Sequence, residues 1–324
     1  FIKVRNSDNY FTLRTKQITA RGELERKVTE EWTTYTGYDN RYTWSYVDVS
    51  FPTRTVAGCV PSPISIGSRR TATISNRYAL IGAFWRNTLH WQDSRWTFLP
   101  NVRVDYFKVT NQILPAHRPA VRYALDDSLT LRAATGLYYQ QPQEVELNST
   151  FGNPNVTAPR AWHYNIGADK DFRNGRSDGW IVSVDSFYKV LENLVIPSTN
   201  LVNQNGKLVA ENYNNKGSGK VYGAQTQIRY EANPWSVGVN YTVSRSTRTE
   251  PGQPEYVFQY DQTHLVGVVG AYDIKNWRFS SRFRYATGNP VTPLNGGTFD
   301  ADGDVYIPRR GPYFSKRLED FYQL

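Results

Sequence analysis

Alternation with a period of two is the feature that most constrains this chain, because helical periodicity is nearly absent from it. Segment 277–285 shows the pattern in full: aromatic residues and Ser281 hold the odd positions, and basic residues and Ser280 hold the even ones. Side chains of a strand point alternately to its two faces, so this segment predicts a strand with one aromatic and one basic face. Similar alternation recurs in 102–106, 129–139 and 237–244. The chain is therefore expected to be all-β.

The predicted connections alternate between short and long along most of the chain. Up-and-down outer-membrane barrels have tight periplasmic turns at one end and long extracellular loops at the other, whereas sandwiches have no reason to sort their loops in this way. The strands, of roughly 10 to 15 residues, exceed the usual length in soluble sheets. We count about 14 strands and predict a transmembrane antiparallel up-and-down β-barrel. The short joins fall near 36–40, 92–95, 126–128, 172–179, 231–234 and 273–276, and the long stretches near 51–76, 108–116, 140–160, 193–218, 247–261 and 288–313.

Composition agrees with this class of fold. No stretch of the 324 residues approaches the roughly 20 apolar positions that a spanning helix needs, but a barrel strand faces lipid only at every second residue. Aromatic residues make up 15% of the chain, which argues against disorder. Several of them stand near predicted strand ends, where interfacial girdles lie in membrane proteins. Cys59 is the single cysteine, so a disulfide framework and a Cys-rich metal site are excluded.

Five segments, in order along the chain, resemble the barrel of TonB-dependent outer-membrane receptors. Together they belong to the C-terminal two-thirds of the chain, and Gln225 stands where the family more often has Glu. Before Tyr78 the match is to a generic barrel only. The segments are SLTLRAATGLYYQQP (128–142), PRAWHYNIGADKDF (159–172), VSVDSFYKVLENLV (182–195), GSGKVYGAQTQIRY (217–230), and YDQTHLVGVVGAYDI followed by NWRFSSRFRYATGNPVTP (260–274 and 276–293).

This resemblance implies a barrel of 22 strands that holds an N-terminal plug domain, in the outer membrane of a Gram-negative bacterium. Residues 1–324 carry neither the plug nor the energy-coupling box that precedes it, and the aromatic-ended closing strand is missing. We therefore expect 1–324 to be one partial outer-membrane β-barrel domain that stops before the closing strands. An unclosed sheet would expose two edges in lipid, so we expect the plug and the remaining barrel strands to come from more of this chain or from another polypeptide.

The leading functional hypothesis is a receptor and transporter for TonB-dependent uptake of a scarce nutrient of the iron chelate, cobalamin or glycan type. Its expected partners are outer-membrane lipid and lipopolysaccharide, a small-molecule ligand, and a TonB-type energy-coupling protein that acts through the N-terminal region absent here. One alternative is a structural outer-membrane barrel in a larger assembly, without transport activity. Another is a soluble carbohydrate-binding β-protein, which would extract without detergent. Nucleic acid is not expected, because no recognition helix or stacking platform is apparent.

Catalysis and metal binding have little support in the sequence. The four histidines are widely spaced, with no His-x-x-x-His pair, and no Ser stands in a Gly-x-Ser-x-Gly motif. The chain is therefore not expected to be an enzyme or to need a cofactor. One acidic segment, DADGD, places Asp300, Asp302 and Asp304 at alternate positions, a spacing that suits Ca²⁺. The Glu that an EF-hand requires is absent, so a solvated turn is the favoured interpretation.

Two sets of side chains are candidates for ligand contact. The first is a basic set that we predict to face the lumen, where it could attract an anionic ligand or form a charged network with the plug. Its members are Arg103, Arg132, Arg278, Arg282 and Arg284. The second is a set near the external mouth, where ring stacking and polar tips could hold a chelate or a sugar. Its members are Tyr138, Tyr139, Trp162, His163, Tyr213, Tyr256, Tyr260 and His264.

Overall fold

The protein is almost entirely antiparallel β-structure in a computed structural model that describes residues 2–6, 9–52, 69–91, 94–148, 152–173, 175–204, 206–301 and 305–324. The strands are β1 (Ile2–Asn6), β2 (Asn9–Lys27), β3 (Trp32–Pro52), β4 (Arg69–His90), β5 (Trp96–Leu99), β6 (Asn101–Phe107), β7 (Gln112–His117), β8 (Ala120–Ala124), β9 (Leu129–Tyr139), β10 (Arg160–Asp171), β11 (Gly179–Gln204), β12 (Lys207–Ala232), β13 (Trp235–Thr249), β14 (Tyr256–Val257), β15 (His264–Ile274), β16 (Trp277–Ala286), β17 (Pro290–Val291), β18 (Leu294–Asp300), β19 (Val305–Arg310), β20 (Lys316–Arg317) and β21 (Phe321–Gln323), and one short helix, α1, covers Glu144–Leu147.

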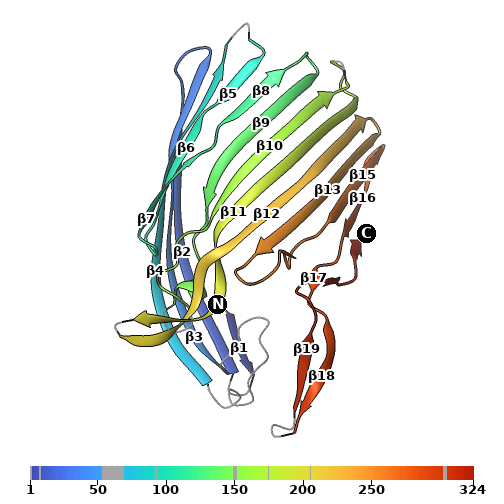
Figure 1. The fold of residues 1–324 in the computed structure, drawn as a ribbon. Coiled ribbons are helices and arrows are strands. Elements are labelled where there is room, and N and C mark those ends of the chain that lie inside the picture. Colours follow the sequence, from blue (N-terminus) through green and yellow to red (C-terminus); the bar gives the residue numbers. More distant parts are fainter. Residues whose placement is uncertain are drawn as a thin grey trace.

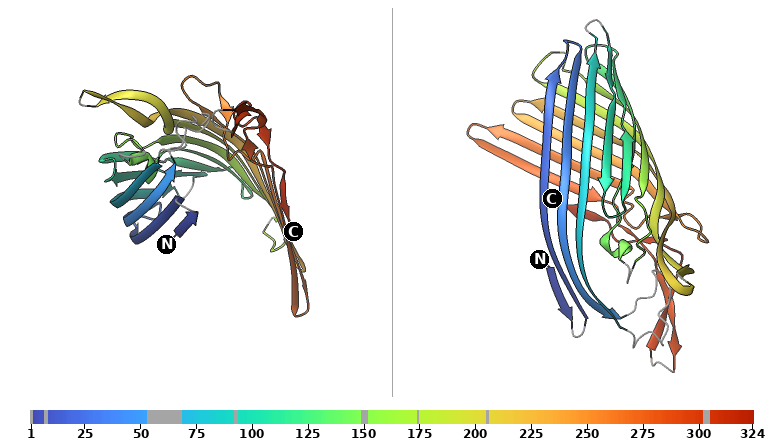
Figure 2. Two further views of the ribbon diagram at one scale, coloured as in Figure 1. Left: turned by 90° about the horizontal axis from the view of Figure 1, so that it is seen from below. Right: turned by 90° about the vertical axis from the view of Figure 1, so that its left-hand side faces the viewer.

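The main sheet follows the chain strand by strand and curves into an open barrel wall (Figures 1 and 2). Because β5 and β6 are halves of one interrupted strand, as are β7 and β8, and β14 has only two residues, its 17 strands make 14 positions across the described residues. This confirms the predicted up-and-down topology and the expected count. In the described part of the chain, β1 pairs only with β2, and β21 pairs only with β16. Strands β1 and β21 are therefore the two edges of an unclosed sheet.

The two interruptions have a local cause in the sequence. Pro100 separates β5 from β6, and Pro119 lies between β7 and β8. Proline has no N–H to give to a strand ladder, so it ends or breaks the pairing at its position. The ladder between β8 and β9 ends at the Ala120–Ala134 pair, followed by a hydrogen bond from the Thr135 N–H to the Pro119 carbonyl (3.1 Å), and beyond it no ladder joins β9 to β7 in the described residues. The wall therefore has a seam between β7 and β9.

Short and long connections lie at opposite ends of the sheet, as predicted. The first short join is wrongly placed at 36–40, because these residues lie within β3 and the turn between β2 and β3 covers 28–31. The tight turns that follow β2, β4, β8, β10, β12 and β15 lie at the upper end in Figure 1, and the extended hairpin of β11 and β12 and the β18–β19 hairpin project at the lower end. One predicted long connection, 108–116, is instead a tight turn followed by β7. Asn111 makes this turn possible because it adopts the left-handed conformation (φ 50°) that asparagine tolerates.

The connection between β9 and β10 packs back against the sheet. The Ser45 hydroxyl on β3 donates to the Glu144 carboxylate on α1 (2.8 Å), and the Asn153 side-chain amide donates to the carbonyl of Tyr213 on β12 (2.8 Å). Ala158 from the same connection joins Phe107 and Leu114 in a buried apolar cluster. No helix in the described residues is long and apolar enough to cross a membrane.

Candidate functional site

Strand register divides the wall into two chemically different faces. Direct cross-strand partners share a face of the sheet, as do residues two apart on one strand. A chain of such partners runs from β16 to β9 through Arg284, Gly267, Asn240, Gln227, Ser183, Asp169 and Thr130. A second chain joins Arg132 to Arg122 and Thr97, on the strand that continues to Arg103. All five predicted basic residues therefore lie on one face, which we call the inner face because the polar face of a membrane barrel lines its lumen.

Two of these arginines are held by ion pairs. Arg132 reaches Asp169 with Nε (2.9 Å) and Asp185 with Nη2 (3.0 Å), and so links three consecutive strands. Gly167 lies between Arg132 and Asp185 in the register, and a Cβ atom there would collide with the Asp185 carboxylate. Glycine at this position therefore makes room for the pair.

Arg103 has a similar arrangement on β6. Its Nη2 lies 2.7 Å from Asp105 Oδ1 and 3.6 Å from Asp39 Oδ2. The Asp105 side chain is buried, and Gly82 faces the pair from β4. These contacts make Arg103 and Arg132 parts of neutralised networks that hold neighbouring strands together.

The arginines of β16 differ from Arg103 and Arg132 in their ion pairing. Arg278 is exposed and lies 3.6 Å from Asp273 across the short turn. Arg282 and Arg284 have no carboxylate within ion-pair distance anywhere in the described chain. Both side chains are exposed on the inner face. The predicted basic set is thus split into a paired group and a group whose charge is available.

Arg21, Arg86 and Arg118 also lie on the inner face and are not among the predicted basic residues. Arg21, Arg86, Arg103 and Arg118 line an open groove of about 400 Å³ together with Tyr138. Arg86 forms an ion pair with Glu23, whereas the Arg118 guanidinium lies over the Tyr138 ring at 4.2 Å and its buried Nε atom has no hydrogen-bond partner. Arg118 stands at the proline interruption, where the alternation pattern that would have revealed it is broken.

The predicted mouth residues do not form one site. On β9 and β10, Tyr138 stacks on His163 with ring centroids 4.3 Å apart, so these two lie together beside Arg118. Tyr139 packs against the buried cluster of Phe107, Leu114 and Ala158.

Two of the remaining mouth candidates lie on the opposite, outer face. Trp162 packs against His117 (5.3 Å between ring centroids), whose strand partner Val102 is on that face. The His264 Nδ1 atom lies 2.9 Å from the Tyr241 hydroxyl, and the two rings are parallel. These positions fit interfacial packing better than a lumenal ligand site.

Tyr213, Tyr256 and Tyr260 lie in the extensions beyond the barrel wall. Burial and the nearby Glu146 raise the pKa of the Tyr213 hydroxyl. Burial and a hydrogen bond to Glu250 raise the pKa of Tyr256, whose ring lies against Phe314. Tyr260 packs edge-on against Phe258 and remains exposed. Tyr213 and Tyr256 therefore keep their hydroxyl protons at neutral pH and can donate hydrogen bonds.

A buried ion pair at the external end was also missed. Asp261, almost fully buried, accepts from the Ser246 N–H (2.6 Å) and forms an ion pair with Arg317. Arg317 in addition donates to the carbonyls of Asp261 (2.7 Å) and Gly288 (2.9 Å). The pair joins connection 250–263 to the segment after β16. Asp261 belongs to the Asp-Gln-x-His motif, but its partner Arg317 lies 56 residues away in the sequence. A local sequence pattern therefore could not indicate this ion pair.

Aromatic side chains form two rows on the outer face. Near the short turns, Trp180 packs on Tyr230 (4.6 Å between ring centroids) and Trp235 on Tyr272 (4.3 Å). Nearer the long connections, Tyr188 lies opposite Tyr222. On β11, β12, β15 and β16 the two rows are eight positions apart, about 26 Å along the strand: Trp180 to Tyr188, Tyr230 to Tyr222, Tyr272 to His264, and Trp277 to Tyr285. Such rows are typical of the interfacial girdles of membrane barrels.

The acidic segment gives no metal site in the described residues, which contain no cluster of three or more His, Cys, Asp or Glu side chains. Asp300 ends β18, whereas Asp302 and Asp304 lie outside the described residues. The Ca²⁺ interpretation stays a prediction.

Comparison with known proteins gives a consistent result. Residues 2–315 match the family model described as TonB dependent receptor-like, beta-barrel. Among solved structures, a variant of the ferric enterobactin receptor of Pseudomonas aeruginosa is 13% identical, with a TM-score of 0.63 over 97% of this chain and 45% of that one. The siderophore receptor PirA of Acinetobacter baumannii is 11% identical, with a TM-score of 0.65 over 98% and 49%.

A third similar structure is the FrpB iron transporter of Neisseria meningitidis, 13% identical, with a TM-score of 0.62 over 97% of this chain and 47% of that one. The chain thus spans slightly less than half the length of each of these three proteins. No curated protein matches the chain.

Proposed function

Because the chain belongs to the TonB-dependent receptor-like β-barrel family, whose members lie in the outer membrane, we propose that it forms part of the wall of a receptor that imports a scarce nutrient. The solved structures that it resembles include receptors and transporters for iron and iron chelates. We propose a nutrient of the iron chelate type, with cobalamin and glycans as the other classes to be tested. In this proposal a plug gates the lumen and a TonB-type protein supplies the energy.

The charge of the inner face supports a preference for anionic complexes. Arg282 and Arg284 carry positive charge without a carboxylate partner in the described chain. A low-dielectric channel lined by one sign of charge concentrates ligands of the opposite sign and raises their rate of capture. This is the observation that carries the proposal, because the paired Arg103 and Arg132 would contribute little such attraction. Bond chemistry is not part of the mechanism, which consists of binding and gated passage.

Uptake by living cells tests this proposal. Cells that depend on this receptor for iron would be supplied with an anionic ferric catecholate or a neutral ferric hydroxamate. The double variant Arg282→Gln/Arg284→Gln is expected to lower uptake of the anionic complex about tenfold and to leave that of the neutral complex unchanged. Lys207→Gln, on the projecting β11–β12 hairpin, is the control.

The outcomes separate the alternatives. Equal loss of both complexes in the double variant would contradict the electrostatic role. Absence of any uptake by the unaltered receptor would favour a structural barrel within a larger assembly. Membership of an outer-membrane family leaves no support for a soluble carbohydrate-binding protein.

A further inference from the structure

The connection between β9 and β10 lies on the lumenal side of the wall. Ser45 on β3, which donates to Glu144 of this connection, is six positions from Asp39 on the same strand. Asp39 reaches Arg103 on the inner face, and side chains an even number of positions apart on a strand share a face. Ser45 and Glu144 therefore meet inside the barrel.

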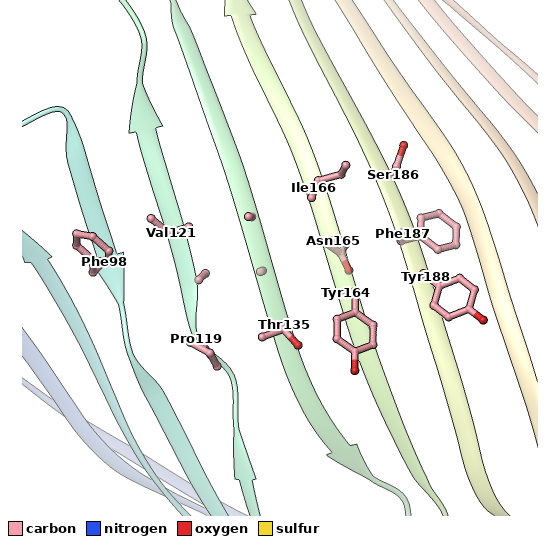
Figure 3. Close-up of a pocket in the computed structure, with 13 residues that line it drawn as sticks. Phe98, Pro119, Val121, Thr135, Tyr164, Asn165, Ile166, Ser186, Phe187 and Tyr188 are labelled. Atoms are coloured by element: carbon pink, nitrogen blue, oxygen red, sulfur yellow. The ribbon is translucent and has the colours of Figure 1, made fainter.

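The outer side of the neighbouring strands is left open. It carries a groove of about 600 Å³ that crosses β8 to β11 and is shown in Figure 3. The groove is lined by side chains of the wall itself, among them Phe98, Val121 and Ile166. The connection covers the opposite face, which a ligand in the lumen would meet.

A second anchor holds the connection to β7. The Ala158 N–H donates to Oε1 of Gln112 (2.8 Å), and Ala158 is buried with Leu114. Leu114 is the direct strand partner of Asp105, the carboxylate that pairs with Arg103. This contact therefore also lies on the inner face.

The third anchor lies far along the sheet, on β12. Asn215 joins Thr157 by two hydrogen bonds, since its Oδ1 accepts from the Thr157 N–H (2.7 Å) and its Nδ2 donates to the Thr157 carbonyl (3.0 Å). The same Nδ2 donates to the carbonyl of Asn193 on β11 (2.8 Å), and the Asn212 side-chain amide donates to the carbonyl of Gly152 (3.1 Å). Because β4 to β11 separate β3 from β12 in the sheet, the connection forms a chord across the curve of the wall.

The connection is also folded tightly upon itself. The Gln143 N–H donates to the Glu146 carboxylate (2.7 Å), and the Asn153 N–H donates to the Glu146 carbonyl (2.7 Å). At Gly152 a Cβ atom would collide with the carbonyls of Val145 and Glu146. A segment with such internal contacts and three anchors on the wall has little freedom to open locally.

We propose that residues 143–148 and 152–158 form a fixed bar across the external mouth, the lumenal bar, which limits the size of the ligands that reach the inner face. This inference rests on the proposed receptor function and deepens it, because a compact chelate would pass beside the bar whereas an extended glycan chain would meet it. The lumenal bar excludes large ligands by its position and not by a closing movement.

Labelling of a cysteine beneath the lumenal bar tests the proposal in intact cells that carry the full-length receptor. Lys189→Cys, in a Cys59→Ser background, places a single thiol on the inner face opposite His163. Its partner on β12, Val221, is six positions from Asn215, or about 20 Å farther into the barrel. A small maleimide is expected to label this thiol readily, and a maleimide on a long polyethylene glycol chain slowly.

Loosening the lumenal bar should remove this difference. Asn215→Ala deletes three hydrogen bonds and is expected to raise the labelling rate of the large reagent about tenfold, with the rate of the small reagent unchanged. Replacement of 141–158 by a short turn should raise it further, and such a turn can join the strands because Tyr139 and Arg160 are direct partners. Asn200→Ala is the matched control, since Asn200 bonds within its own hairpin.

The outcomes separate this inference from the proposed function. Equal labelling by the large reagent in Asn215→Ala and in the control would overturn the size limit, and Asn215→Ala decides this even if the shortened variant fails to fold. Joining Ser45→Cys to Glu144→Cys with a short bifunctional thiol reagent should leave uptake of an iron chelate unchanged, and loss of uptake would show that the connection has to move. Absence of chelate uptake by the unaltered receptor would contradict the proposed function alone, because labelling reports access and not import.

Discussion

At the scale of single residues, Asp126 shows how a short turn is stabilised. Its Oδ1 atom accepts from the Ser128 N–H (2.8 Å), the Ser128 hydroxyl (2.6 Å) and the Leu129 N–H (2.9 Å). These hydrogen bonds, led by that of the Ser128 hydroxyl, lower the pKa of Asp126 to about 2. The carboxylate form is therefore favoured by folding.

A pH dependence follows from the direction of this shift. Because the folded pKa lies below the unfolded value of about 3.9, the contribution of Asp126 is complete above about pH 4 and is lost as the pH falls through about 2. Amide exchange at Ser128 and Leu129 is expected to be faster, after correction for the intrinsic rate, at pH 2 than at pH 5. Asp126→Asn should remove most of this difference, and its persistence in that variant would assign the effect to another group.

Gly167 is the second residue whose role can be tested alone. Gly167→Ala would push the Asp185 carboxylate away from Arg132, since the new methyl group would occupy its position. We expect a loss of about 1–3 kcal/mol in the free energy of unfolding, measured by urea titration in lipid vesicles. Gly267→Ala is the control, because Gly267 shares the inner face and a Cβ there meets nothing within 4 Å. Similar losses in both variants would mean that strand backbone effects, not the ion pair, dominate.

At the scale of elements, the Asp261–Arg317 pair links two external segments. Removing one partner of a buried ion pair leaves an uncompensated charge and costs about 3–5 kcal/mol. Arg317→Ala is therefore expected to release the segment between β16 and β21, and limited proteolysis of intact cells should cut it several-fold faster. Arg309→Ala, at an exposed position on β19, should leave the cleavage rate unchanged. Unchanged cleavage of Arg317→Ala would show that other contacts hold the segment.

The elements were predictable to the extent that alternation was unbroken. Segment 277–285 predicted β16 and its two faces, because every side chain in it follows the pleat. Alternation does not reveal β7, which lies within the predicted long connection 108–116 and contains Pro115, a residue that favours loops over strands. Pairing partners such as Asp261 and Arg317 depend on contacts across the fold, which a local pattern does not record.

At the scale of the whole molecule, the sequence predicts that the arginines share one face of the sheet. It does not predict which of them have a carboxylate partner. Alternation places Arg103 and Arg282 on the same side of the sheet, but only the register shows that one has Asp105 beside it and the other has no carboxylate in the described chain. The mouth residues were grouped by proximity to loops. In the structure these residues lie on the inner face, on the outer face and in the extensions, because consecutive side chains of a strand point to opposite faces of the sheet.

The two aromatic rows also set a thickness for the surrounding membrane. Eight positions along a strand that tilts by about 40° span roughly 20 Å along the membrane normal. This is thinner than the hydrocarbon core of an average bilayer, about 30 Å, and the bacterial outer membrane is itself thinner than average. In a thick bilayer the wall would have to thin the lipid around it, at a cost that grows with each ångström of hydrophobic mismatch. The spacing of its aromatic residues thus adapts this barrel to the thin membrane in which its family lies.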